Sequence, residues 1–132
     1  MPLLFERNDQ ETVHTVATQF IKFYYDNLNA KNYQQINTLI KPYTIMSFEK
    51  VRYNGNNMST LFQRYNNMNI EFLAKDYDTL HSCSRRNNIV ITGLIRYIED
   101  GQQIERQFTE YIHLATGKEN EFWIQIAIFK LI

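Results

Sequence analysis

The C-terminal half of the chain decides its fold: residues 69–132 read NIEFLAKDYDTLHSCSRRNNIVITGLIRYIEDGQQIERQFTEYIHLATGKENEFWIQIAIFKLI. Apolar side chains stand at every second position in four long segments, and turn residues separate the segments. Because side chains alternate between the two faces of a strand, this spacing predicts four long β-strands, each with an apolar face. The sets expected to share a face are Ile89/Ile91/Ile95/Tyr97, Phe108/Ile112/Leu114 and Phe122/Ile124/Ile126/Ile128. Long antiparallel strands twist and curl, so we expect a curved sheet with a concave side to be filled.

The N-terminal half supplies helices that can fill the concave side. Apolar residues recur at helical spacing from Val13 to Leu28, after the capping residues Asn8 and Asp9. A second, shorter helix is expected between Tyr33 and Pro42, and a third over 58–68, with a tight hairpin of two short strands between them. Helices followed by strands predict an α+β domain. The expected fold is a strongly curved antiparallel sheet that forms a cone, filled by a long N-terminal helix with two shorter helices.

The bulk properties point to one domain, residues 1–132, because domains usually hold about 100–150 residues. Lys+Arg and Asp+Glu both number 14, so no basic excess is present to neutralise phosphates, and we expect no direct nucleic-acid binding. We expect the pair Arg85-Arg86 to be a solvated turn. No apolar run approaches the roughly 20 residues that span a bilayer, and Met1–Phe5 does not continue into a leader. The single cysteine, Cys83, allows no internal disulfide and indicates a reducing compartment.

Four stretches together resemble the nuclear transport factor 2-like family, over most of the chain from Val13 to Leu131. They are the aromatic run FIKFYY at 20–25, Phe48-Glu49 followed by Gly55 and a helix, RQFT at 106–109 before YIHL at 111–114, and Trp123 followed by FKL at 129–131. Each stretch is common alone, and their order and spacing carry the resemblance. The family's fold is a cone of α+β type. The resemblance implies a non-enzymatic protein-interaction module of nucleocytoplasmic transport, found in the nucleus, the cytoplasm and at the nuclear envelope.

The last strand indicates where a partner would bind. Residues 123–132, WIQIAIFKLI, are apolar on both faces, so one face can cover the cone while the other needs a partner. We therefore expect a homodimer, or a heterodimer with a related domain, formed by the sheet face that points away from the helices. The side chains predicted to make it are Tyr111, His113, Trp123, Gln125 and Phe129. The alternative is that the segment Met1–Phe5 folds over this strand.

The resemblance also implies two further sites. Phe48, Glu49 and Tyr53 are expected near a site for the phenylalanine-glycine repeats of nucleoporins. The acidic cluster that contacts the GTPase Ran in the family's import carrier is reduced here to Glu99 and Asp100. Two members compete within this interpretation, a Ran-import-type carrier and the small subunit of an mRNA-export receptor. Phe48-Glu49 favour the import carrier, whereas Arg106 and the reduced acidic cluster favour the export cofactor, which is the preferred interpretation.

The alternative function is a small-molecule enzyme or binder that uses the cone cavity, of isomerase or dehydratase type. Such an enzyme needs a buried acid or imidazole with a tuned pKa. The candidates are His14, His81, His113, Asp26 and Cys83, and none stands in a recognisable catalytic motif. No metal-ligand spacing, phosphate loop or dinucleotide fingerprint is present, so we predict no catalytic residues, no metal and no cofactor. A core packed solid by Phe20, Tyr24, Phe62 and Phe108 would exclude this alternative. A third possibility, a module of a stress-granule or ubiquitin-related scaffold, normally carries a long tail for which 132 residues leave no room.

Overall fold

The computed structural model describes residues 10–82, 86–117 and 121–132. Within them the chain runs from helices into strands, as an α+β domain was predicted to do. The elements are α1 (Gln10–Asn29), α2 (Tyr33–Asn37), β1 (Ile45–Phe48), β2 (Val51–Asn54), α3 (Met58–Met68), β3 (Glu71–Ser82), β4 (Arg86–Glu99), β5 (Gln102–Thr116) and β6 (Phe122–Leu131). No helix in this described part of the chain is both long and apolar enough to cross a bilayer.

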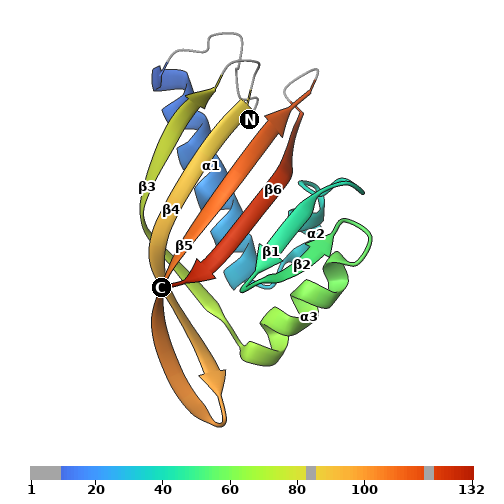
Figure 1. Ribbon diagram of the computed structural model, residues 1–132, viewed down its shortest axis with the longest axis vertical. Helices are drawn as coiled ribbons and strands as arrows, with labels where there is room; N and C mark the ends of the chain where they lie inside the picture. The colour runs from blue at the N-terminus through green and yellow to red at the C-terminus, as the bar shows by residue number, and fades with distance from the viewer. Residues whose placement is uncertain (1–9, 83–85, 118–120) are drawn as a thin grey trace.

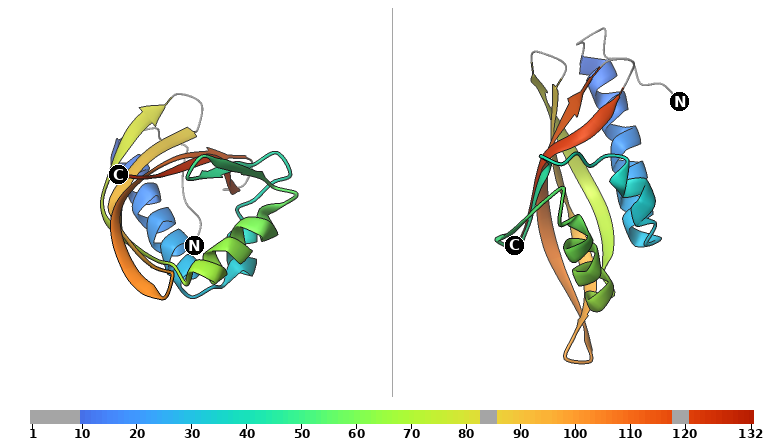
Figure 2. Two further views of the ribbon diagram at one scale, coloured as in Figure 1. Left: turned by 60° about the horizontal axis from the view of Figure 1, so that its bottom comes forward. Right: turned by 90° about the vertical axis from the view of Figure 1, so that its right-hand side faces the viewer.

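All six strands join one curled sheet in the order β2-β1-β6-β5-β4-β3. The sheet wraps around α1, and β1, β2 and α3 lie to one side of the four long strands (Figures 1 and 2). Neighbouring strands are antiparallel except β1 and β6, which run parallel. A parallel pair needs a long connection, and α3 with the β3–β4–β5 meander provides it between β1 and β6. The cone-shaped α+β fold predicted from the sequence is confirmed, with this one parallel pair added.

A glycine allows the sheet to bend sharply where β3 and β4 meet. A Cβ atom on Gly93 would lie 2.1 Å from the carbonyl oxygen of Leu73 and 2.9 Å from the ring of Phe108. The β3–β4 register shifts at the same place, between Ala74 and Asp76. Bulges bend and twist a strand, so the glycine and the bulge together produce the curl of the sheet over α1.

The end of α1 is fastened to the start of β3. The side-chain amide of Asn29, the last residue of α1, donates to the Phe72 carbonyl (2.8 Å) and accepts from the Phe72 N–H (2.7 Å). One side chain thus pairs with both backbone groups of the edge strand, as a neighbouring strand would. This contact fixes α1 across the concave side, where Val16, Ala17, Tyr24 and Leu28 are each 2 % exposed or less.

Strand β6 changes phase halfway along, which the sequence pattern did not predict. Ile124 is fully buried, but beyond it Ala127 and Phe129 point inward (0 % and 1 % exposed), and Ile128 is 37 % exposed. The cause is a register shift against β5, where Leu114 pairs with Ile124 and His113 with Ile126. The extra residue turns the rest of β6 over. The expectation that 122, 124, 126 and 128 share one face was therefore wrong beyond Ile124.

Candidate functional site

The side chains on the convex side of β4, β5 and β6 form a largely apolar surface, here called the outer face. Its rows follow the strand register: Val90 lies opposite Tyr111 and Tyr111 opposite Ile128, while His113 lies opposite Ile126. These side chains are half-buried or exposed, whereas their neighbours along each strand point into the core. We define the outer face as the central part of this side, formed by Asn88, Val90, Tyr111, His113, Trp123, Gln125, Ile126 and Ile128; the same rows continue at one end through Thr92, Thr109 and the exposed Lys130.

Hydrogen bonds within the outer face hold its aromatic side chains in place. The Tyr111 hydroxyl donates to Oδ1 of Asn88 (2.7 Å), and Nε1 of Trp123 donates to Oε1 of Gln125 (3.2 Å). The ammonium of Lys41 lies 5.5 Å from the centroid of the Trp123 ring, at the margin of the face. The polar ends of both rings are thereby satisfied within the chain, and their apolar surfaces remain available.

Four of the five side chains predicted to bind a partner lie on the outer face, and the fifth does not. Phe129 is 1 % exposed and stacks against Phe108 (centroids 4.8 Å apart) and Phe48 (4.9 Å). Because of the phase change in β6, its ring lies in the core and cannot contact a partner. Ile126 and Ile128, which were expected inside, occupy the outer face in its place.

The three residues predicted to bind phenylalanine-glycine repeats lie together, but they are used within the fold. Phe48 is 1 % exposed and Tyr53 6 %. The guanidinium of Arg64 lies 4.6 Å from the Phe48 ring centroid and donates to the Phe48 carbonyl and the Tyr53 hydroxyl, both at 3.3 Å. The carboxylate of Glu49 accepts from the backbone N–H of Leu131. These contacts attach the β1–β2 hairpin to α3 and β6 and leave neither ring open to a repeat.

The remaining candidates are spread over the molecule. Glu99 and Asp100 are exposed at the β4–β5 turn, where Asp100 takes a left-handed backbone (φ 52) before Gly101 (φ 77). Asp26 is exposed and ion-paired with Lys22 (3.2 Å), so it is not an acid inside the cone. The side chains of His14 and His81, and Cys83 with Arg85 and Met1–Phe5, lie outside the described residues. In the part that the structure describes, no three His, Cys, Asp or Glu side chains are grouped to hold a metal ion.

An acid that sequence analysis did not single out lies inside the cone. Glu110 is 2 % exposed, and its Oε1 accepts a hydrogen bond from the Tyr25 hydroxyl (2.6 Å). Burial raises the pKa of Glu110 to about 7, although the hydrogen bond from Tyr25 opposes the shift. Burial and the nearby Glu110 charge raise the pKa of both tyrosines. This carboxyl can therefore take up or release a proton near neutral pH, when most carboxyls are ionised.

The sequence contained a signal for Glu110. Glu110 lies between Phe108 and Ile112 on the same face of the strand, so a strand that buries the two apolar side chains must bury the acid as well. The ring of Tyr25, whose hydroxyl donates to Glu110, packs against Phe108 and Phe72, with ring centroids 6.2 Å and 5.9 Å apart. No packed apolar core accepts a carboxyl without a hydrogen-bonding partner, and Tyr25 provides that partner.

Comparisons with known proteins agree with this architecture. The family model of the nuclear transport factor 2 domain matches residues 16–131. Among solved structures, nuclear transport factor 2 from Cryptosporidium parvum is 20% identical, with a TM-score of 0.73 over 91% of this chain and 94% of that one. The yeast UBP3-associated protein BRE5 is 14% identical, with a TM-score of 0.74 over 91% and 96%.

A third similar structure is that of an enzyme candidate. A candidate ketosteroid isomerase from Shewanella frigidimarina is 10% identical, with a TM-score of 0.72 over 89% of this chain and 97% of that one. No curated protein sequence matches the chain. At these identities the solved structures show a shared fold, whereas the family model covers nearly the whole sequence. The chain therefore belongs to the nuclear transport factor 2 domain family.

Proposed function

We propose that this protein is a non-enzymatic protein-interaction module of nucleocytoplasmic transport that associates with a second domain through its outer face. The observation that carries the proposal is the composition of that face. Tyr111 and Trp123 lie on the same face as Ile126 and Ile128, and the first charge along the β6 row is the exposed Lys130 at its end. The cores of protein interfaces are enriched in aromatic residues and depleted of charges in this way.

The surroundings of the outer face support the same proposal. Ile128 lies within the sheet, between Tyr111 on β5 and Ser47 on β1, and is 37 % exposed. Without a partner, this apolar side chain is in contact with water. Exposed apolar patches of this kind usually mark binding surfaces. A second domain of the same kind, either a copy of this chain or a related one, offers a matching convex sheet.

The finer proposal is a subunit of an mRNA-export cofactor, with a Ran-import-type carrier as the competing member, working in the nucleus and cytoplasm and at the nuclear envelope. It draws on the resemblance of the four sequence stretches and on the two exposed acids, Glu99 and Asp100, that remain of a larger cluster. Phenylalanine-glycine repeats stay among the proposed partners. Since Phe48 and Tyr53 are closed within the fold, repeats would have to use other side chains.

The test of the outer face is a charge placed at its centre. Ile128→Glu should abolish self-association in sedimentation equilibrium at micromolar concentration, or abolish capture of a related-domain partner if the isolated chain is monomeric. Val51→Glu is the matched control, because Val51 is also an exposed β-branched strand residue (45 %) but lies away from the outer face. Association that survives Ile128→Glu, or that both variants reduce equally, would refute the proposal.

A second candidate function, a small-molecule enzyme or binder that uses the interior of the cone, is favoured by one observation. Glu110, hydrogen-bonded to Tyr25, is a buried acid with a pKa of about 7, which suits general acid–base chemistry. Against it stands the packing around the acid, since Phe20, Tyr24, Phe62 and Phe108 are 6 % exposed or less. Thermal-shift screening of small ligands with wild type and Glu110→Gln separates the two functions. Stabilisation by a ligand that is lost in Glu110→Gln would establish the enzyme-type site.

A further inference from the structure

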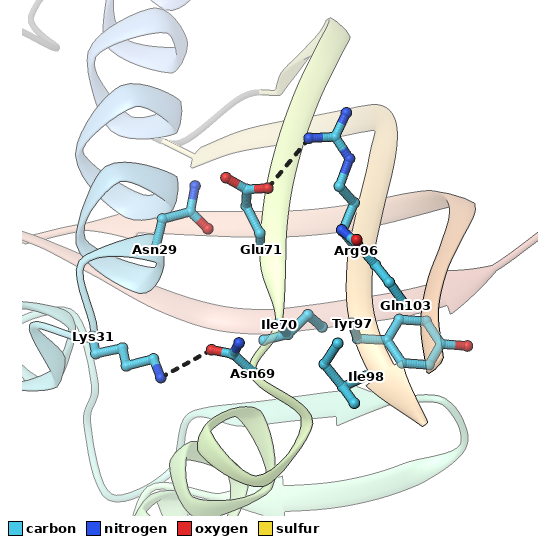
Figure 3. A pocket seen from close by; sticks show the side chains of 9 residues that line it. All are labelled: Asn29, Lys31, Asn69, Ile70, Glu71, Arg96, Tyr97, Ile98 and Gln103. Carbon is cyan, nitrogen blue, oxygen red and sulfur yellow. Dashed lines mark hydrogen bonds and ion pairs between the residues drawn. The ribbon is translucent and has the colours of Figure 1, made fainter. Parts of the chain in front are cut away.

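A pocket of about 290 Å³ opens where the ends of two helices meet the β4–β5 hairpin. Asn29 ends α1, Asn69 follows α3, and the far wall comes from β4 and β5 (Figure 3). The pocket is lined by Asn29, Lys31, Asn69, Ile70, Glu71, Arg96, Tyr97, Ile98 and Gln103. None of these residues belongs to the outer face, so the pocket is a separate surface of the molecule.

The pocket combines an apolar side with a polar rim. Ile70 and Tyr97 are buried (6 % and 7 % exposed), while Ile98, which also lines the pocket, is 41 % exposed. The amides of Asn69 and Gln103 are exposed beside it. The volume lies just below the roughly 300–1,000 Å³ of pockets that enclose drug-sized ligands. It therefore suits one or two side chains of a larger partner better than a whole small molecule.

The two cations that line the pocket differ in their partners. Arg96 is held by two carboxylates, Glu105 at 2.9 Å and Glu71 at 3.6 Å, so its charge is already matched. Lys31 donates only to the neutral Oδ1 of Asn69 (3.3 Å) and has no carboxylate within ion-pair distance among the described residues. Figure 3 shows this ammonium directed at the side chain of Asn69. The rim thus offers one cationic donor whose charge is unmatched.

The backbone fixes the position of this donor. Lys31 and its partner Asn69 both have left-handed conformations, with φ of 60° and 47°. Asparagine adopts this region readily, whereas a lysine there costs free energy that glycine would avoid. The turn after α1, which the contact of Asn29 with Phe72 anchors to the sheet, therefore fixes the backbone of Lys31, and the hydrogen bond to Asn69 directs its ammonium to the rim.

We propose that this pocket binds a short acidic segment of a partner protein, in which an apolar side chain stands beside a carboxylate. The apolar side chain packs on Ile98 between Ile70 and Tyr97. The carboxylate pairs with the ammonium of Lys31, while the side-chain amides of Asn69 and Gln103 form hydrogen bonds with the backbone of the segment. The carboxylate is the side chain of an internal Asp or Glu of the partner. The proposal goes beyond association through the outer face and adds a second binding surface.

The test is a titration of the isotope-labelled protein with short peptides, followed by NMR. The probes are acetyl-Gly-Leu-Asp-Gly-amide, its Leu-Asn counterpart, and acetyl-Gly-Gly-Leu with a free C-terminal carboxylate. We expect saturable shifts of the Asn69, Ile98 and Gln103 amide signals with the Leu-Asp peptide, and binding at least tenfold weaker with the Leu-Asn peptide. Binding of the free-carboxylate peptide that is as tight as that of the Leu-Asp peptide would contradict an internal Asp or Glu as the source of the carboxylate.

Two protein variants separate specific binding from general attraction of acidic peptides. Lys31→Asn removes the charge and keeps a residue that tolerates the left-handed backbone, so it should weaken Leu-Asp binding at least tenfold. Lys50→Asn is the matched control, because Lys50 is exposed and has the same left-handed conformation (φ 71) in the β1–β2 turn, away from the pocket. Binding should be unchanged in Lys50→Asn.

Three further outcomes would overturn the proposal. They are no saturable shifts up to millimolar peptide, equal weakening by both lysine variants, or shifts centred away from the pocket. If Lys31→Asn lowered only the stability of the fold, Lys31 would serve to neutralise the helix ends and the pocket would have no ligand role. Ile128→Glu should bind the peptides as wild type does, so a failure here is distinguishable from a failure of the proposed outer-face association.

Discussion

At the level of single residues, folding changes the protonation of Glu110 near neutral pH. Its pKa in the folded protein is about 7, against an ordinary value of 4.5, because burial disfavours the charged form. Between these two values the unfolded chain has released the proton while the folded chain still holds it. The free energy of unfolding should therefore fall as pH rises from about 4.5 to about 7, and level off above. At ~1.36 kcal/mol per pH unit, the loss is about 3 kcal/mol.

Glu110→Gln removes this titration and keeps a side chain of similar shape that the Tyr25 hydroxyl can still contact. Urea unfolding at pH 5, 6, 7 and 8 should show a stability that is nearly flat with pH for the variant and that declines for wild type. The variant should exceed wild type by up to about 3 kcal/mol at pH 8. Glu71→Gln, an exposed acid on β3, should keep the wild-type decline. Parallel pH profiles for wild type and Glu110→Gln would contradict the buried-acid account.

At the level of elements, the phase change of β6 makes a prediction opposite to simple alternation. Phe129 is buried against Phe48 and Phe108. Phe129→Ala should therefore lower the free energy of unfolding by about 3–5 kcal/mol, because packing is lost and a cavity is left. Ile128→Ala on the exposed side should cost well under 1 kcal/mol in the separated chain. Chemical denaturation of the two variants measures both values. Equal losses would mean that β6 keeps a single phase.

The elements can be predicted from the sequence, whereas the details that depend on tertiary contacts cannot. The helices and strands and their order followed from periodicity, since Phe108, Ile112 and Leu114 are buried as expected. The β6 bulge could not be predicted, because it depends on how Gln125 fits opposite β5. The burial of Phe48 also depends on distant partners, Arg64 and Phe129. Glu110 could have been found from its alternation with Phe108, whereas the pocket beside Lys31 depends on where two helices happen to end.

The edge strand β3 is protected by its own acids, which gives a second prediction for an element. The carboxylates of Asp76 and Asp78 accept from the N–H groups of Tyr77 and Thr79, each at 2.9 Å. Strand β3 is the last strand of the sheet, so these N–H groups would otherwise be open to another chain. Asp76→Thr/Asp78→Thr should produce concentration-dependent association in light scattering. Glu99→Thr/Glu105→Thr, which removes the same charge from the β4–β5 hairpin, should not.

At the level of the whole molecule, association through the outer face would couple stability to concentration. The sheet buries one face against α1 and presents Tyr111, Trp123 and Ile128 on the other, so part of the apolar surface would be covered only in such a complex. A folded dimer is favoured over unfolded monomers by mass action. For a homodimer, each tenfold rise in protein concentration adds about 1.4 kcal/mol, and the Tm should rise by a few degrees.

This concentration dependence is measured by calorimetry of wild type and Ile128→Glu between micromolar and near-millimolar protein. Wild type should show a rising Tm, and Ile128→Glu a constant one, because a charge at the centre of the outer face opposes desolvation. Val51→Glu should behave as wild type does. A wild-type Tm that is constant excludes the homodimer and leaves the related-domain heterodimer, for which the same dependence must appear when the partner is titrated in. If neither titration changes the Tm, association through the outer face does not occur.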